Sequence, residues 1–353
     1  MGIRIGSLQT GRRNAITDVP GVKVGHVSVI DGDGPLRPGE GPIRTGVTAV
    51  LPHGGNLFEE KVCAAAHVIN GFGKSVGLPQ VAELGNIETP IMLTNTLNVW
   101  TVADALVDYV SEQNPKIGSF NPVVGECNDG FLNDILGRHV RKAHVFRALE
   151  DAGVDVAEGN VGAGVGMSGF GWKGGIGTSS RRPAGALSDF TAGVLALTNT
   201  GQASELRIDG VPVGRELTPV SSAEIAGSIM MIVATDAPVS ARQLGRVGRR
   251  AAFGLARTGG TASHGSGDFV IAFTTGNRIS ASGRQSAIPN PFVPEPLLSL
   301  LFNAVIDATE EAIVNSLLKA ETLTGRDGHT RIGIPIDRLK AILGRYRGFA
   351  PKF

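Results

Sequence analysis

The chain has 353 residues, enough for one large domain or two ordinary ones, and 42% of them are hydrophobic against 18% charged. This balance excludes intrinsic disorder, and a net charge of +1 argues against a nucleic acid or an anionic membrane as a partner. Neither an apolar signal segment nor an 18-residue apolar window is present, so we expect a cytoplasmic protein with no membrane span.

The glycine and cysteine content further narrows the class of protein that this sequence can encode. Glycine occurs 50 times, about twice the ~7% of an average protein, without a collagen period. Such a chain needs many tight turns and close backbone approaches, which favours a sheet-rich enzyme with functional loops. Cys63 and Cys127 have no metal or redox spacing and are expected to be reduced core residues.

The first half of the chain alternates strand-like and helix-like stretches. Residues 22–30 alternate apolar and polar side chains as a half-buried strand does, and 45–55 form a second strand that a glycine pair closes. Apolar residues at helical spacing predict a helix over 97–110, which Asn114-Pro115 ends. Residues 137–152 predict an exposed basic helix.

The second half continues the mixed pattern. Residues 193–201 and 228–235 are expected to be buried strands, and 237–258 a helix with Ser240 as its N-cap. A strand is expected over 269–275, and a long helix over 296–318. Neither a repeat nor a long linker divides the chain, which predicts a single mixed α/β domain.

The glycine-rich segment 159–181 contains the spacing G-x-G-x-x-G at Gly164, Gly166 and Gly169. A dinucleotide site also needs a helix directly after this motif, with the phosphate at its N-terminus. Residues 169–177 carry a glycine every two or three positions and do not sustain a helix. We therefore expect a backbone-lined loop near a binding cleft and no cofactor.

Metal and serine-hydrolase sites are also disfavoured. The seven histidines show no metal-ligand spacing, so no metal is expected. A nucleophile elbow requires a strand, a turn and then a helix, whereas Gly265-Ser266-Gly267 leads into a strand.

Two interpretations remain for Ser266. One is a plain glycine-flanked loop. The other is an N-terminal nucleophile, released by cleavage of the Gly265–Ser266 bond, whose new α-amine serves as the base for its own hydroxyl. The reference pKa of that amine is ~7.7–8.0, so it is partly neutral at cellular pH. Attack on the preceding carbonyl favours a strained residue without a Cβ, as Gly265 is.

Four further residues are candidates for the same site. Glu126 follows an apolar strand, and Asn199 ends another, where its amide suits a developing oxyanion. Thr309 interrupts the apolar face of the last long helix, and Glu311 lies close to it in the sequence. Each also has a plain structural interpretation as a turn residue or a hydroxyl bonded to its own helix.

Long segments of the chain resemble the DmpA-type aminopeptidases, the P1 peptidase family of L-aminopeptidase/D-esterases and β-peptidyl aminopeptidases. The similarity extends over nearly the whole chain and includes ITDVPGVKVGHVS (16–28), TGVTAVLPHGGN (45–56), NPVVGECNDGFLND (121–134), LRIDGVPVG (206–214) and HGSGDFVIAF (264–273).

The resemblance implies a four-layer αββα sandwich like that of the N-terminal-nucleophile (Ntn) hydrolases. It also implies one domain, 1–353, that cuts itself between Gly265 and Ser266 into chains 1–265 and 266–353. By the same resemblance Ser266 is the nucleophile, Asn199 the oxyanion donor, and Thr309 and Glu311 support the nucleophile and its amine. Glu126 would hold the ammonium group of a small peptide, amide or ester substrate, and the assembly would be a homotetramer of processed pairs.

The sequence departs from this family in one respect. Some members place a catalytic tyrosine near the acidic motif, but this chain has only Tyr109 and Tyr346, while Phe131 and Phe170 have no hydroxyl. Two alternatives stay open, a self-processing amidase or acyltransferase and a small-molecule binder without turnover.

Overall fold

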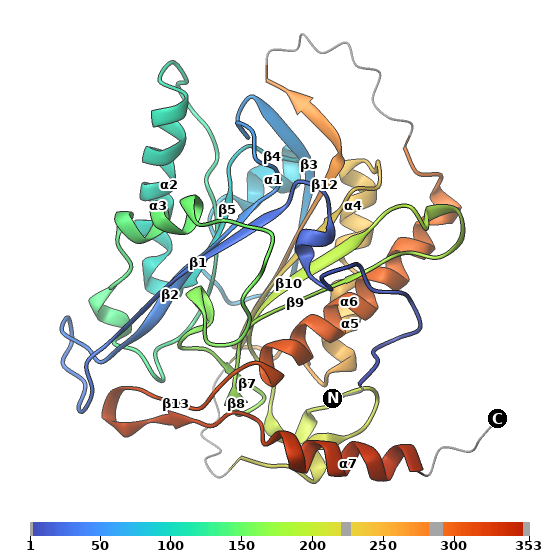
Figure 1. The fold of residues 1–353 in the computed structure, drawn as a ribbon. Coiled ribbons are helices and arrows are strands. Elements are labelled where there is room, and N and C mark those ends of the chain that lie inside the picture. Colours follow the sequence, from blue (N-terminus) through green and yellow to red (C-terminus); the bar gives the residue numbers. More distant parts are fainter. Residues whose placement is uncertain (1–2, 220–226, 282–291, 349–353) are drawn as a thin grey trace.

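The computed structural model describes residues 3–219, 227–281 and 292–348. Two β-sheets lie face to face, and helices cover the outer side of each (Figure 1). The first sheet has the order β1-β2-β5-β6, and the second has the order β4-β3-β12-β11-β10-β9. The four-layer αββα sandwich is therefore confirmed.

The strands of the two large sheets are mostly antiparallel, with β5–β6 and β11–β12 as the parallel pairs. Their bounds are β1 Lys23–Asp31, β2 Ile43–Leu51, β3 Glu60–Gly71, β4 Asn86–Ile87, β5 Ile91–Asn95, β6 Val123–Cys127, β9 Gly175–Arg181, β10 Ala192–Asn199, β11 Ser228–Thr235 and β12 Gly267–Ser280. Two short hairpins add β7 Ser168–Gly169, β8 Trp172–Lys173, β13 Leu323–Thr324 and β14 Thr330–Arg331.

The described helices are α1 Leu78–Leu84, α2 Val99–Gln113, α3 Lys142–Glu150, α4 Ala241–Gly248, α5 Ala251–Arg257, α6 Leu298–Leu318 and α7 Ile336–Gly348. Helices α2 and α3 pack on the four-stranded sheet, while α4 and α6 pack on the six-stranded sheet and α5 packs against α6.

Three hydrophobic clusters correspond to the three contacts between the four layers. On β10, Leu195 and Leu197 face the opposite sheet, whereas Val194 and Ala196 face the helices. A strand that is buried on both faces is apolar at nearly every position, which explains the continuous apolar runs of β10 and β11.

Two of the expected helices differ in extent. The stretch 137–152 is helical only over α3, because a 3-10 turn precedes it and Arg138 adopts a left-handed backbone with φ of 47°. The expected helix over 237–258 is divided into α4 and α5. The division follows Gly248, a poor helix former, and Ser240 caps α4 as expected.

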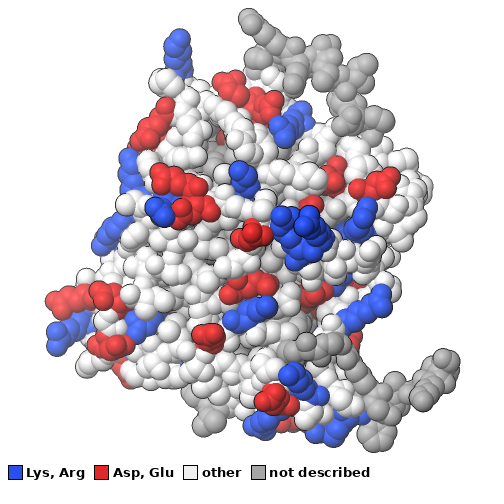
Figure 2. All heavy atoms as spheres, viewed as in Figure 1, with Lys and Arg blue, Asp and Glu red and all other residues white. Residues whose placement is uncertain are grey.

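The face shown in Figure 2 carries acidic and basic side chains side by side. None of the helices in the described ranges is long and apolar enough to cross a membrane.

Candidate active site

Ser266 lies directly before β12, where three strands of the six-stranded sheet begin or end together. In the sheet register Ser228, the first residue of β11, pairs with Asn199 on one side and with Gly267 on the other. The Ser228 hydroxyl also accepts a hydrogen bond from the Gly267 N–H at 3.1 Å. The sheet therefore brings Ser266 and Asn199, which are 67 positions apart in the sequence, to the same edge.

The hydroxyl of Ser266 is fully buried, with an exposed fraction of 0%. It donates to Asp268 Oδ1 over 2.7 Å. Asp268 is equally buried, and within the described residues its second oxygen, Oδ2, has no hydrogen-bond partner. Burial raises the pKa of this carboxyl to about 6, and the hydrogen bond from Ser266 lowers that pKa in part. Asp268 is not among the residues that the sequence pattern singles out, although it stands only two positions after the serine.

The segment before Ser266 forms a turn that Asn70 of β3 holds. The Ser266 N–H donates to the carbonyl oxygen of Ser263 at 2.9 Å. Asn70 Nδ2 lies 3.0 Å from the carbonyl oxygens of both Ser263 and His264, and it also donates to that of Ser266.

Backbone strain in this segment is not where we expected it. The left-handed residues near the turn are Gly259, with φ of 92°, and Ala262, with φ of 49°. Gly265 is not among the described residues of positive φ. Gly265 lacks a Cβ, as expected for the residue before the proposed cleavage, but its backbone does not adopt a left-handed φ.

Glu126 lies near the end of β6 and joins the site through residues 72–74. Its Oε1 accepts from the Lys74 N–H at 3.0 Å, and its Oε2 accepts from the Thr96 hydroxyl. Two positions before Lys74, the Phe72 N–H donates to the carbonyl oxygen of Ser266 at 3.3 Å. One short segment thus contacts both the buried carboxylate and the candidate nucleophile.

Asn199 is held in place through both ends of its amide. Its Oδ1 accepts from the Ser168 N–H at 2.8 Å, and its Nδ2 donates to the Asn128 carbonyl oxygen at 3.0 Å. Since an amide nitrogen carries two hydrogens, one donor of Asn199 is left for a ligand. Asn128 is two residues beyond Glu126, so this bond also ties Asn199 to β6.

Glu311 does not lie at this edge of the sheet. It pairs with Arg181 and accepts from Asn14 Nδ2 at 2.6 Å. Arg181 is the last residue of β9, and the first residue, Gly175, pairs with Thr198 beside Asn199. Six residue steps of a strand separate the two ends by about 20 Å. The supporting role that the resemblance gave Glu311 has no counterpart in the observed contacts.

Thr309 lies inside the helix layer. Its hydroxyl donates to the Val305 carbonyl oxygen of its own helix at 2.7 Å. A Cβ on Gly254 of α5 would lie 2.5 Å from Thr309 Cβ, so the residue packs in the α5–α6 contact. The structural interpretation of Thr309 as a hydroxyl bonded back to its helix is the one that these contacts support.

The glycine-rich segment encloses a lysine. The buried Lys173 Nζ donates to the carbonyl oxygens of Gly164, Met167 and Gly174 at 2.7–3.0 Å. Burial lowers the pKa of Lys173 to about 7, while the charge of Asp129 acts in the opposite direction. Short strands and β9 follow the motif in place of a helix.

A cavity of about 550 Å³ lies beside this edge of the sheet. Its wall includes Asn199, Ser168, Arg331 and the turn residues 261–263. The guanidinium of Arg331 stacks 3.9 Å above the ring of Phe131, one of the two residues noted in place of a tyrosine. A volume of this size is typical of sites for small ligands.

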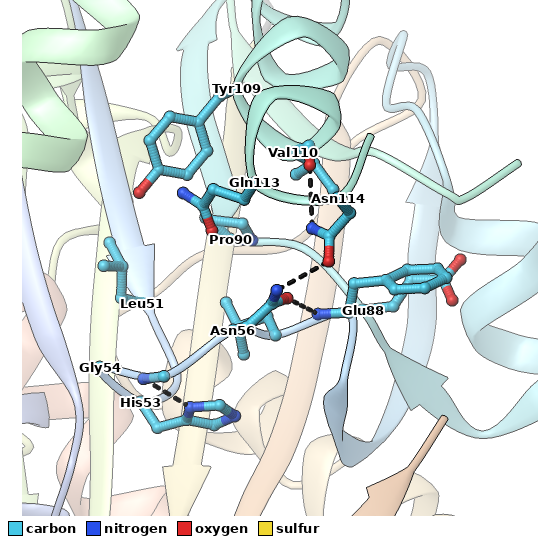
Figure 3. Close-up of a pocket in the computed structure, with 13 residues that line it drawn as sticks. Leu51, His53, Gly54, Asn56, Glu88, Pro90, Tyr109, Val110, Gln113 and Asn114 are labelled. Carbon is cyan, nitrogen blue, oxygen red and sulfur yellow. Dashed lines mark hydrogen bonds between the residues drawn. The ribbon is translucent and has the colours of Figure 1, made fainter. Parts of the chain in front are cut away.

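A second cavity, of about 210 Å³, lies beside Pro90 (Figure 3). Pro90 precedes the first residue of β5, whereas Thr94, near the last residue, pairs with Glu126. The polar side chains of this cavity bond to each other and to nearby backbone: Asn56 Nδ2 donates to Asn114 Oδ1 at 2.7 Å, and His53 Nδ1 accepts from the Gly55 N–H at 3.1 Å. The described residues that line it include no serine, threonine or cysteine. The 550 Å³ cavity is therefore the better candidate for a reaction site.

Fold and site together define the class as a hydrolase of the DmpA type, whose fold is a variant of the Ntn-hydrolase fold. The sequence pattern of peptidase family S58 matches residues 14–331, and the chain belongs to this family. It is an aminopeptidase by that membership.

Individual relatives agree with this assignment. The chain is 44% identical to the β-peptidyl aminopeptidase BapA of Sphingosinicella microcystinivorans, over 96% of this chain and 90% of BapA. Among solved structures, the PH0078 protein of Pyrococcus horikoshii OT3 is 53% identical, with a TM-score of 0.94 over 98% of both chains. The L-aminopeptidase D-Ala-esterase/amidase of Ochrobactrum anthropi is 36% identical, with a TM-score of 0.91 over 99% of this chain and 98% of that one.

Proposed function

We propose that this aminopeptidase processes itself and then uses Ser266 as an N-terminal nucleophile to release the first residue of short peptides, amides or esters. The observation that carries the proposal is the meeting of Ser266, Asn199 and Glu126 around one end of β12. A hydroxyl, an amide donor and a buried carboxylate are the groups that acyl transfer from an amine-bearing substrate requires.

Burial of Ser266 explains why cleavage would come first. In the continuous chain its hydroxyl is inaccessible, and residues 261–263 form part of the wall of the neighbouring cavity. Cleavage after Gly265 frees this segment to move away from the serine. The same event creates the α-amine that then acts as the base.

In the mature enzyme Glu126 would bind the substrate ammonium group and Asn199 would donate to the oxyanion. The amine of Ser266 removes the proton of its own Oγ, which attacks the scissile carbonyl. The proton then passes to the leaving amine, and water hydrolyses the resulting ester. The ion pair with Glu126 selects substrates with a free amino group.

The test compares wild type with Ser266→Ala and, as a matched control, Ser111→Ala at the far end of α2. Intact mass should show two fragments for wild type and the control, and one uncut, inactive chain for Ser266→Ala. A panel of L-, D- and β-aminoacyl amides measures hydrolysis, and an added acceptor amine measures acyl transfer. A wild-type enzyme that hydrolyses these amides as a single uncut chain would refute the proposal. The expected homotetramer stays a prediction, which sedimentation of the processed enzyme checks.

A further inference from the structure

Self-cleavage needs a base that the mature mechanism does not supply. Before the chain is cut, the Ser266 nitrogen is a peptide N–H that donates to the Ser263 carbonyl oxygen. A peptide nitrogen has no basic lone pair, so it cannot accept the proton of the serine hydroxyl. Some other group has to remove that proton when Oγ attacks the Gly265 carbonyl.

We propose that Asp268 is this base: its carboxylate, 2.7 Å from Ser266 Oγ and buried with it, takes the hydroxyl proton during self-cleavage. The inference rests on the proposed function, because it concerns the step that produces the nucleophile. Direct hydrogen-bond contact with the reacting oxygen makes Asp268 a catalytic residue for this step.

Burying a carboxylate at the position of Asp268 costs folding free energy, which a merely structural residue would not require. A carboxylate that is fully buried and bonded through only one of its oxygens is poorly solvated. An asparagine would accept the same hydrogen bond without a charge. The neighbouring strands offer no compensating cation, since the residues paired with Asp268 are Asn70 on β3 and Ile229 on β11.

The step balances as a shift of the acyl group followed by hydrolysis. Asp268 takes the Oγ proton as Oγ bonds to the Gly265 carbonyl carbon, and it returns that proton to the Ser266 nitrogen as the C–N bond breaks. The product is an ester between Gly265 and Ser266 with a free amine. Water then attacks the ester, which leaves a Gly265 carboxylate and the restored serine hydroxyl.

The experiment follows self-cleavage of the full chain after a short pulse of cell-free synthesis with labelled amino acids. Asp268→Asn keeps the size and the acceptor oxygen but removes the base. Asp236→Asn is the matched control, because Asp236 is a partly buried aspartate just beyond the opposite end of β11. We expect wild type and Asp236→Asn to cut at rates within about 2-fold, and Asp268→Asn to cut roughly 10²-fold more slowly or more.

The outcomes separate the two proposals. A wild-type chain that never cuts would overturn the proposed function, and the inference with it. A wild type that cuts while Asp268→Asn cuts within about 3-fold of it would overturn the inference alone. Thermal unfolding of uncut Asp268→Asn and uncut Ser266→Ala should give similar midpoints.

A measurement on wild type decides the matter if Asp268→Asn does not fold. The newly made chain is diluted into buffers from pH 5 to pH 8, and the uncut fraction is followed. The titratable group that faces Asp268 from β6 is the Cys127 thiol, which stays neutral because burial raises its pKa. With Asp268 as the base, whose pKa is about 6, the rate should rise several-fold between pH 5 and pH 7 and then level off. A rate that is constant over this range would overturn the inference.

Discussion

Asn70 on β3 lies opposite Asp268 on β12, and its side-chain amide donates to the backbone carbonyl oxygens that flank the Gly265–Ser266 bond. One residue thus fixes the turn on both sides of the bond that we propose is cut. The pairing of β3 with β12 places Asn70 opposite Asp268, and so beside the turn that carries Ser266.

Asn70→Ala should slow self-cleavage by about 10-fold, because the turn loses donors worth about 1 kcal/mol each. The cleaved fraction against time, measured by intact mass, checks this. Asn160→Ala removes a comparable side-chain amide bond, to the Glu321 carbonyl, on an exposed part of the chain, and it should cut at the wild-type rate. Equal rates for the two variants would show that the turn does not depend on Asn70.

Glu126→Gln should lower kcat/KM for substrates with a free amino group by about 30-fold, or about 2 kcal/mol. The glutamine keeps one acceptor oxygen, for the Lys74 N–H, and its NH2 group can donate to the Thr96 hydroxyl oxygen, but it no longer carries the charge that pairs with an ammonium. Self-cleavage involves no ammonium ligand and should proceed normally. Loss of self-cleavage in this variant, or a cleaved variant whose preference for free amines is unchanged, would contradict the role given to Glu126.

Ser228→Ala should destabilise the fold by about 1–3 kcal/mol, since the buried Gly267 N–H loses its acceptor. Denaturant unfolding of the uncut Ser266→Ala chain, with and without the second substitution, measures this difference. An unchanged free energy of unfolding would mean that the end of β12 does not depend on this bond.

Gly177→Ala should prevent folding or destabilise it severely, because a Cβ there would lie 1.9 Å from the Ala312 carbonyl oxygen where α6 packs on β9. Gly344→Ala, in α7, meets no atom within 4 Å and should be neutral or stabilise the chain by up to about 1 kcal/mol. Thermal unfolding of the two variants compares them directly, and similar midpoints would contradict the close packing of α6 on β9.

Patterning alone predicts the strands that have a clear apolar signal, such as β1, β10 and β11, and also α2 and the Ser240 cap. The pattern does not predict β3, which is rich in alanine and runs through Cys63 and His67, because small side chains give a weak periodic signal. The glycine-rich pattern over β9 predicts a loop. Gly177 of β9 is required because α6 approaches its backbone, and Gly175 because the backbone of Gly159 does; both causes are tertiary contacts.

The site was predictable only in part. Ser266, Asn199 and Glu126 stand at strand ends, where the sheets bring distant segments together. The role of Glu311 rested on the resemblance alone, and residues next to each other on a helix point in different directions. Its partner Arg181 lies at the far end of β9. Asp268 was overlooked because a strand residue two positions on reveals its contact with Ser266 only once the turn is known.

The most direct test of the mechanism is the N-terminal sequence of enzyme that is purified in its active form. We predict two sequences in equal amounts, one from the original start and one that begins Ser-Gly-Asp-Phe at Ser266, with all activity in the cleaved species. Full activity in a preparation that yields only the original N-terminus would contradict an N-terminal nucleophile at Ser266.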